Sequence, residues 1–230
     1  ECIYRFFELF DLPNLSCADE LAHNSLPLTA PPKTYLEEKM LFALLTNGNL
    51  ADFWRRELGG KFFKQLLNAL PMTWVMDPAP LPPHAALPEL NLTNWSQLKT
   101  LSQRERALIL KRSGFHEEAW GARSVKLGSD LSQADWATGV QTAVDEFEQS
   151  PWILQRYHKP RQVTHEWFDF DRGEPICMTG RARLCPYYFV QLGERPEVKL
   201  GGILATICPA DKKIIHGMRD AILAPCTIAD

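Results

Sequence analysis

The chain has 230 residues, a formal net charge of −3, 45% hydrophobic residues and 23% charged residues. This composition is typical of an ordinary globular protein, and the length is enough for one large domain or two small lobes. The slightly negative charge predicts no general attraction to nucleic acid or anionic lipid. No apolar run in the sequence approaches the roughly 20 residues needed to cross a bilayer. We therefore expect a soluble, cytoplasmic protein without nucleic-acid or membrane partners.

The cysteines of the chain are scattered without any C-x-x-C pair, at Cys2, Cys17, Cys177, Cys185, Cys208 and Cys226. A chain of this length does not need disulfides to hold its fold, and its histidines and cysteines lack the close, repeated spacing of a zinc site. We therefore expect reduced thiols. The sequence opens at Glu1 directly into an apolar run, from which we expect a piece cut from a longer polypeptide.

Residues 1–70 are expected to form a strand and several helices, the remnant of a preceding lobe. Residues 2–10 are rich in aromatic and branched side chains and are followed by a break at residues 11–14, which predicts a strand or another short element that ends in a turn. Thr34 and Glu37 have the spacing of a capping box, which predicts a helix that starts there and ends at residues 47–49. Residues 50–57 and 61–70 predict two more helices, separated by Gly59 and Gly60, with an aromatic stripe expected in the core.

Residues 71–157 are expected to form a small lobe. Residues 71–77 predict a short strand, and the proline-rich residues 78–88 predict an irregular surface connector. Residues 107–110 predict a buried strand that ends at Lys111, and residues 124–127 predict its hairpin partner. Between them, Ser113 and Gly114 open a flexible loop that Gly121 closes. A capped, amphipathic helix is predicted from Ser132, followed after Pro151 by a strand at residues 152–155.

Residues 158–230 are expected to form a sheet-rich lobe. From residue 163 onward the apolar pattern has the period of two that is typical of strands. We predict strands at residues 163–170, 176–183, 187–192 and 200–208, and a short helix within residues 213–223. The predicted fold class is α+β with largely antiparallel sheets. The division into two lobes is what the family resemblance given below implies.

Lys111 is the first candidate binding residue, and the stretch around it has two interpretations. It is either a solvent-facing lysine of an ordinary hairpin or a cation held beside backbone amides that glycine leaves accessible, an arrangement that suits a phosphate. A lone lysine beside glycines is a weak signal compared with a complete phosphate-binding loop. The choice between a solvent-facing lysine and a phosphate-binding lysine therefore depends on the elements around this stretch.

The order of elements resembles that of the ATP-grasp superfamily. The chain has a lysine in the LEEKM segment, the strand lysine of ILKRSG, a glycine-bounded loop, an amphipathic helix and a strand that ends in Gln155. More narrowly, residues 34–183 look like the glutathionylspermidine-synthase-like and related uncharacterised bacterial ATP-grasp proteins. The resemblance implies an ATP-grasp-like fold in which two α+β lobes enclose a nucleotide cleft.

The resemblance also implies roles for individual residues. The residues expected to bind the ATP phosphates and the adenine edge are Lys39, Lys111, Ser113, Gly114, Gly121, Gln155, Arg156 and Tyr157. The expected catalytic residues, which would hold the γ-phosphate, are Arg181 and Arg183. Members of the superfamily bind Mg²⁺ through an acidic residue followed shortly by Glu and Asn, and this sequence departs from that pattern. The nearest substitutes are Glu166 and Asp211, which we take as the candidate metal ligands.

The function implied by the resemblance is ATP binding within a larger carboxylate–amine or carboxylate–thiol ligase that acts through an acyl phosphate. Its cofactors would be ATP and Mg²⁺. Its partners would be small-molecule carboxylate and amine substrates and further domains of the same polypeptide. Two alternatives stay open: a degenerate ATP-grasp-like scaffold or binding module without catalysis, and a sheet-rich interaction domain without a nucleotide site.

Overall fold

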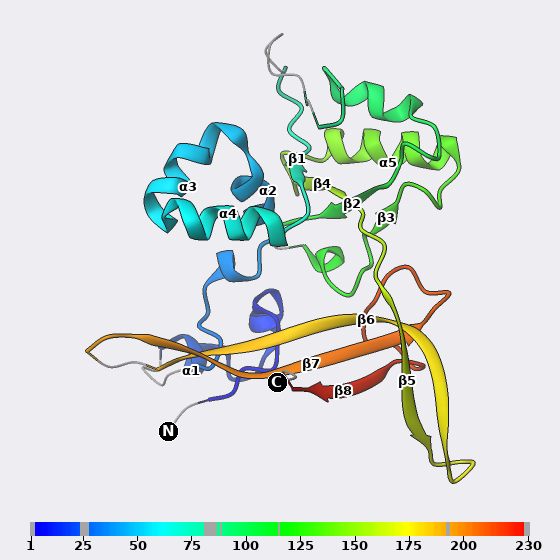
Figure 1. Cartoon of the computed structure of the whole chain (residues 1–230). Coiled ribbons are helices and arrows are strands. Elements are labelled where there is room, and N and C mark those ends of the chain that lie inside the picture. Colours follow the sequence, from blue (N-terminus) through cyan, green and yellow to red (C-terminus); the bar gives the residue numbers. More distant parts are fainter. Residues whose placement is uncertain are drawn as a thin grey trace. The chain divides into compact units, whose positions relative to one another are not determined.

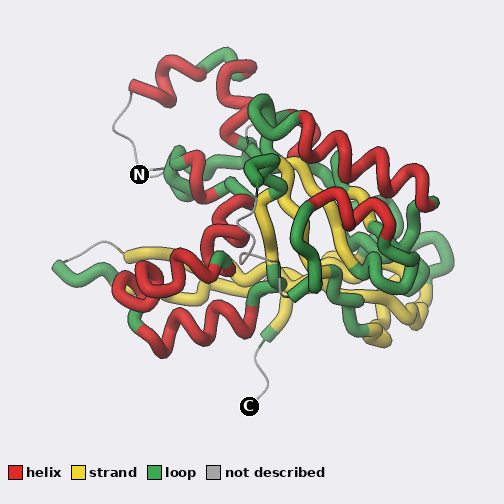
Figure 2. The backbone as a smooth tube through the Cα atoms, turned by 90° about the horizontal axis from the view of Figure 1, so that it is seen from above, coloured by secondary structure: helices red, strands yellow, loops and turns green. Residues whose placement is uncertain are grey.

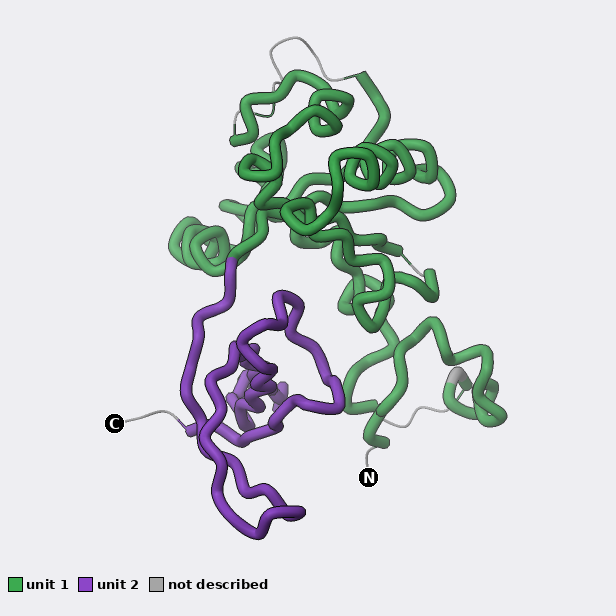
Figure 3. Tube along the Cα trace, turned by 90° about the vertical axis from the view of Figure 1, so that its right-hand side faces the viewer, with its two compact units in different colours: residues 1–158 green, residues 159–230 purple. Residues whose placement is uncertain are grey.

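The computed structural model describes residues 3–23, 28–80, 87, 89–114, 116–191 and 194–227. The chain forms two compact units, Glu1–His158 and Lys159–Asp230, coloured green and purple in Figure 3. We call them unit 1 and unit 2. Each contains a four-stranded sheet in which all neighbouring strands are antiparallel. The predicted α+β class with largely antiparallel sheets is therefore confirmed.

Before β1, the described secondary-structure elements of unit 1 are all α-helices or 3-10 turns. Helices are drawn in red in Figure 2. The α-helices are α1 (Ala18–His23), α2 (Met40–Thr46), α3 (Ala51–Leu58) and α4 (Gly60–Ala69), and the 3-10 turns are η1 (Leu9–Asn14), η2 (Thr34–Leu36) and η3 (Gly48–Leu50). Gly59 separates α3 from α4 with a φ of 76°, a left-handed conformation that favours glycine. The two predicted helices and the glycine break between them are confirmed.

Two expectations for the amino-terminal segment are wrong. In residues 3–10, only Ile3 forms a β-bridge, to Leu28, and a 3-10 turn begins at Leu9. The expected capping box does not start a helix, because Thr34 starts only a 3-10 turn and α2 begins at Met40. The Glu37 carboxylate instead accepts hydrogen bonds from the Arg5 guanidinium and from the Leu9 amide, the latter at 2.9 Å. The Glu37 side chain, which the local pattern predicted to cap a helix, forms an ion pair with Arg5, a residue far away in the sequence.

The aromatic stripe of α3 and α4 is also not the core stripe that we expected. Phe63 is buried, but Phe62 is 63% exposed and Phe53 is 44% exposed. The periodicity correctly predicted helices with one apolar face. It did not predict how much of that face would be covered.

The sheet of unit 1 consists of β1 (Thr73–Val75), β2 (Leu108–Arg112), β3 (Lys126–Leu127) and β4 (Trp152–Arg156), in the order β1-β4-β2-β3 (Figure 1). The predicted hairpin is confirmed, since Ile109 of β2 pairs with Leu127 of β3. Lys111 lies within β2 and not at its end. The connector after β1 is irregular where it is described, but residues 81–86 and 88 lie outside the described residues.

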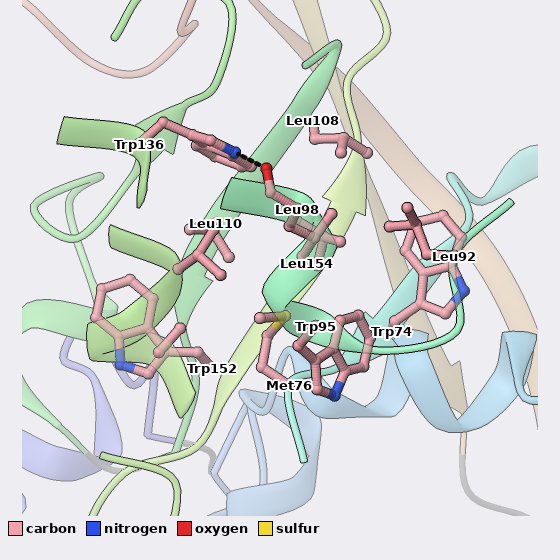
Figure 4. Close-up of a cluster of buried hydrophobic side chains, with 12 residues drawn as sticks. Trp74, Met76, Leu92, Trp95, Leu98, Leu108, Leu110, Trp136, Trp152 and Leu154 are labelled. Atoms are coloured by element: carbon pink, nitrogen blue, oxygen red, sulfur yellow. Dashed lines mark hydrogen bonds between the residues drawn. The ribbon is translucent and has the colours of Figure 1, made fainter. Parts of the chain in front are cut away.

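Helix α5 (Gln133–Asp145) packs on one face of this sheet. It starts as predicted, because the Ser132 hydroxyl accepts from the Asp135 amide at 3.1 Å. Trp136 of α5 is fully buried, and its indole N–H donates to the Leu98 carbonyl at 2.8 Å, in the turn η4 (Trp95–Thr100). Figure 4 shows these side chains with those of the strands, namely Trp74, Leu108, Leu110, Trp152 and Leu154. This cluster is the main core of unit 1.

Unit 2 is a meander of β5 (Gln162–Asp169), β6 (Glu174–Gln191), β7 (Glu197–Pro209) and β8 (Ile222–Cys226). The strands expected at residues 176–183 and 187–192 are one strand, although Leu192 lies outside the described residues. β6 continues through Pro186 because the described pairing with β5 ends at Arg181, so that β6 pairs only with β7 there and has an edge that tolerates proline. The expected helix at residues 213–223 is wrong, since turns and bends lead directly to β8.

The helices in the described part of the chain are all too short or too polar to cross a bilayer. The described cysteines, which are Cys17, Cys177, Cys185, Cys208 and Cys226, are free thiols.

Candidate functional site

The strands of unit 1 present a second face, opposite the core that α5 covers. Successive residues of a strand point to opposite faces, and directly paired residues share a face. Thr73 and Ile109 both pair with Gln155, and Lys111 pairs with Ile153. Together with Val75, these residues form what we call the polar face of the sheet. The pleat therefore brings Thr73, Lys111 and Gln155 to one side of three adjacent strands.

A chain of hydrogen bonds joins the three polar residues of this face. The Lys111 ammonium donates to Gln155 Oε1 at 2.7 Å, and Gln155 Nε2 donates to Thr73 Oγ1 at 2.9 Å. The Thr73 hydroxyl donates in turn to the Pro71 carbonyl at 2.9 Å. Gln155 is only 7% exposed and Thr73 only 1%. The Lys111 amine is therefore anchored by a buried hydrogen-bonded chain, which we call the relay.

A second lysine approaches from the start of α2. Lys39 precedes the helix, donates to the Ala119 carbonyl and lies 5.0 Å from the centre of the Trp120 ring. Ala119 and Trp120 belong to the glycine-bounded loop, which contains the turn η5 (Glu117–Ala119). Gly114 and Gly121, at the two ends of that loop, have φ values of 77° and 61°. Lys39 thus connects the start of α2 to the loop that the sequence predicted to be flexible.

The two lysines are electrostatically coupled. Burial, together with the nearby positive charge of Lys39, lowers the pKa of Lys111 to about 8. Burial also lowers the pKa of Lys39, while the carboxylates of Glu38 and Glu8 oppose that shift. Among the described residues, no carboxylate forms an ion pair with Lys111. A half-buried cation with a neutral partner and a like-charged neighbour is an electrostatic cost that a bound anion would remove.

Glu38 holds the beginning of the loop. The Ser113 hydroxyl donates to its carboxylate, which also accepts from the backbone amides of Met40 and Gly114. Burial raises the pKa of Glu38, but these hydrogen bonds outweigh burial and bring the pKa below its ordinary value. Glu38 is therefore ionised at neutral pH and ties Ser113 and Gly114 to the start of α2.

The sequence-predicted residues of unit 1 divide into two groups. Lys39, Lys111, Ser113, Gly114 and Gln155 surround the polar face and the loop beside it, and Gly121 closes that loop. Arg156 and Tyr157, which follow Gln155, have partners away from Lys111. The Arg156 guanidinium donates to the Glu89 carbonyl at 2.8 Å, and the Tyr157 amide donates to the Ala107 carbonyl at 2.9 Å.

The predicted residues of unit 2 have other partners. Arg181 is buried, and its guanidinium donates to the carbonyls of Pro160 and Ala210 at 2.6 Å and 2.9 Å. Arg183 is exposed and reaches the Ile215 carbonyl at 3.4 Å. Glu166 is exposed on β5, and Asp211 is exposed and pairs with Lys212 at 2.9 Å. In the described part of the chain, no three His, Cys, Asp or Glu side chains gather as metal ligands would.

Sequence reasoning missed three residues of the site: Glu38, Thr73 and Trp120. Trp120 stacks on Phe10 with ring centres 5.3 Å apart, and its indole nitrogen is buried without a hydrogen-bond partner in the described structure. Its place inside the glycine-bounded loop was the available signal. Nothing in the sequence pattern distinguishes Glu38 from its acidic neighbour, and the role of Thr73 depends on strand pairing.

A cavity of about 590 Å³ lies along the free edge of β1, between that strand and the end of α2. Its described lining includes the acidic residues Asp77 and Glu89 but no lysine or arginine. The cavity therefore does not suit a phosphate, in contrast to the region around Lys111.

The arrangement around Lys111 can hold an anionic group. Two ammonium groups from different elements, one anchored by the relay, act on each other electrostatically, and such a pair of cations suits phosphate oxygens. Comparison of the chain with family models, with curated proteins and with solved structures found no match.

Proposed function

We propose that the chain binds ATP through its phosphates at the polar face of unit 1, as the nucleotide-binding part of an ATP-grasp-like enzyme. The observation that carries the proposal is the environment of Lys111: a half-buried ammonium group with a neutral hydrogen-bond partner, beside the ammonium group of Lys39. The phosphates would take both lysines as counter-ions, and the loop from Gly114 to Gly121 would fold over them. The polar face would be one wall of the nucleotide cleft.

The reaction that we propose is ATP-dependent ligation of a small carboxylate to an amine or a thiol. The γ-phosphoryl group is transferred to the carboxylate, and the nucleophile then attacks the acyl phosphate and releases phosphate. Such chemistry needs positioning and charge stabilisation from the protein and no covalent nucleophile. Lys111 and Lys39 would neutralise charge that builds up on the phosphates.

The candidate magnesium ligands do not fit that role well. Asp211 is engaged with Lys212, and Glu166 does not belong to any group of three acidic, His or Cys side chains within the described residues. The proposal therefore takes Mg²⁺ as the ion that accompanies ATP and assigns it no protein ligand.

Thermal unfolding with and without Mg-ATP tests the proposal. A ligand at about 100 times its dissociation constant stabilises the folded state by about 2.7 kcal/mol, so ATP should raise the Tm by several degrees. Lys111→Met should abolish the shift. Lys64→Met is the matched control, because it removes the same charge from an exposed position on α4. No shift in the unmutated chain would refute ATP binding.

A second candidate function, a nucleotide-binding module without catalysis, is favoured by the state of Arg181. Its guanidinium is buried and donates to two backbone carbonyls, which hold it in place. Release of phosphate from ATP distinguishes the two candidates. Turnover that requires both Lys111 and a carboxylate substrate supports the ligase, whereas ATP binding without turnover, tested with varied carboxylates and amines, supports the module.

A further inference from the structure

The orientation of the Gln155 amide follows from the chemistry of its neighbours. A lysine ammonium group donates hydrogen bonds and accepts none, so the atom 2.7 Å from Lys111 Nζ must be the amide oxygen. The amide nitrogen therefore faces Thr73, whose hydroxyl oxygen must accept. The hydroxyl proton is then left for the Pro71 carbonyl, 2.9 Å away. Each donor in the relay has one acceptor, and reversing the amide would break two of the three bonds.

The far end of the relay is rigid. Thr73 is held through its backbone as well, because the Thr46 hydroxyl donates to its carbonyl at 2.6 Å and lies 3.3 Å from its amide nitrogen. Thr46 is itself in the last turn of α2, the helix that begins beside Lys39. Gln155 is therefore fixed by two elements, and it fixes Lys111.

We propose that Gln155 is a positioning residue, whose neutral amide aims the Lys111 ammonium group while leaving its full positive charge for a bound anion. An ammonium group has three N–H donors, and Gln155 takes one, so two remain for phosphate oxygens. A glutamate would orient the lysine equally well, but its charge would cancel the attraction for phosphate. The inference rests on the proposed function, since it describes how the same site treats its ligand.

The charges around Lys111 make the choice of glutamine consequential. Lys39 is the charged neighbour that acts on it, and Glu38, the adjacent carboxylate, is occupied by Ser113 and the amides of Met40 and Gly114. Gln155→Glu would therefore place the first carboxylate against Lys111. The change preserves the size of the side chain and its acceptor oxygen. It reverses the charge and also replaces the amide donor to Thr73 Oγ1 with a second acceptor, so Thr73→Val is needed to measure the loss of that hydrogen bond separately.

The test compares Gln155→Glu with the unmutated chain by two measurements. The first is the pKa of the Lys111 amine, followed by NMR of labelled lysine side chains and assigned with Lys111→Met. The second is the affinity for Mg-ATP and for inorganic tripolyphosphate as a function of pH, measured by calorimetry. We expect Gln155→Glu to raise the Lys111 pKa by at least one unit and to weaken both ligands at least 10-fold at pH 7.

Gln141→Glu is the matched control. Lys99 donates to the Gln141 amide oxygen at the protein surface, so the same substitution creates a lysine–glutamate pair far less buried than that of Lys111. It should change affinity by less than 2-fold. Thr73→Val, which removes the relay but adds no charge, should weaken the ligands by about 2-fold to 5-fold without raising the Lys111 pKa.

The outcomes separate the two proposals. An unchanged Lys111 pKa in Gln155→Glu, or a raised pKa with unchanged affinity, would overturn the positioning role while ATP binding stands. If Gln155→Glu raises the Lys111 pKa but the unmutated chain binds neither Mg-ATP nor tripolyphosphate, the proposed function is overturned. The statement that Gln155 leaves the lysine charge for a bound anion then fails with it.

Discussion

The two faces of the unit 1 sheet are built from alternate residues of the same strands, yet they differ in what they contribute. On the face covered by α5, Leu110 and Leu154 are fully buried in an apolar core. On the polar face, Lys111 and Gln155 occupy the neighbouring positions and form a partly buried hydrogen-bonded pair. The first arrangement gains free energy from burial, whereas the second retains a charge at a cost. Such a local departure from good packing is expected where a protein binds something.

The largest expected effect comes from the apolar face. Trp136→Ala should lower the free energy of unfolding by about 3–5 kcal/mol, because it removes a fully buried ring and leaves the Leu98 carbonyl without its donor. Urea denaturation followed by circular dichroism measures the change. A loss below 1 kcal/mol would mean that α5 does not stabilise this face of the sheet, and the contrast between the faces would fail.

The polar face should show its cost as a pH dependence. The pKa of Lys111 falls from 10.5 in the unfolded chain to about 8 in the fold, a difference that corresponds to about 3 kcal/mol. Between those pH values the unfolded chain binds more protons, so the stability contributed by this group rises with pH. The penalty is complete below pH 8 and disappears by pH 10.5.

Lys111→Met isolates that contribution, since other groups also titrate in this range. From pH 7 to pH 10.5, the unfolding free energy of the unmutated chain should rise by about 3 kcal/mol relative to that of Lys111→Met. Lys64→Met should show no such movement. A flat difference for Lys111→Met would show that the lysine is solvated and that the polar face carries no stored cost.

A smaller effect is expected at the junction of the loop and α2. Glu38→Gln replaces charge-assisted hydrogen bonds to Ser113, Met40 and Gly114 with neutral ones and should cost about 1–2 kcal/mol at pH 7. Because the folded pKa of Glu38 lies below 4.5, its contribution is present above pH 4.5 and is lost as the pH falls below that value. The variant and the unmutated chain should therefore converge in stability in acid, as thermal unfolding can show.

Elements with local causes could be predicted from the sequence. Helix α5 has its own cap at Ser132 and an apolar period, and β2 and β3 each have an apolar pattern of their own and follow each other in the chain, so nearby residues contain the necessary information. Glu37 shows the limit. It had the right spacing for a cap, but Arg5, far away in the sequence, forms a buried ion pair with it.

The candidate site follows the same rule. Lys111 could be selected from its strand and its glycine-bounded loop, whereas Gln155 was selected through the resemblance to ATP-grasp proteins. Their contact, and the part played by Thr73, depends on the pairing of β1 and β2 with β4, which no local pattern encodes. The sequence could therefore name the members of the cluster but not the relay that joins them.

The smallest predicted effect concerns Trp120 in the glycine-bounded loop. If Trp120 contacts the ligand, its substitution should weaken ATP binding without lowering stability, whereas substitution of a core tryptophan lowers stability. Its buried indole N–H has no acceptor in the described structure, whereas that of Trp136 has one. Trp120→Phe keeps the stacking on Phe10 and the ring beside Lys39, so the unliganded protein should keep its stability or gain up to about 1 kcal/mol. If the N–H donates to a phosphate oxygen once the loop folds over ATP, affinity should fall by about 5-fold to 10-fold, as calorimetry can measure. A loss of stability with unchanged affinity would make Trp120 a packing residue and would confine the ligand contacts to the lysines.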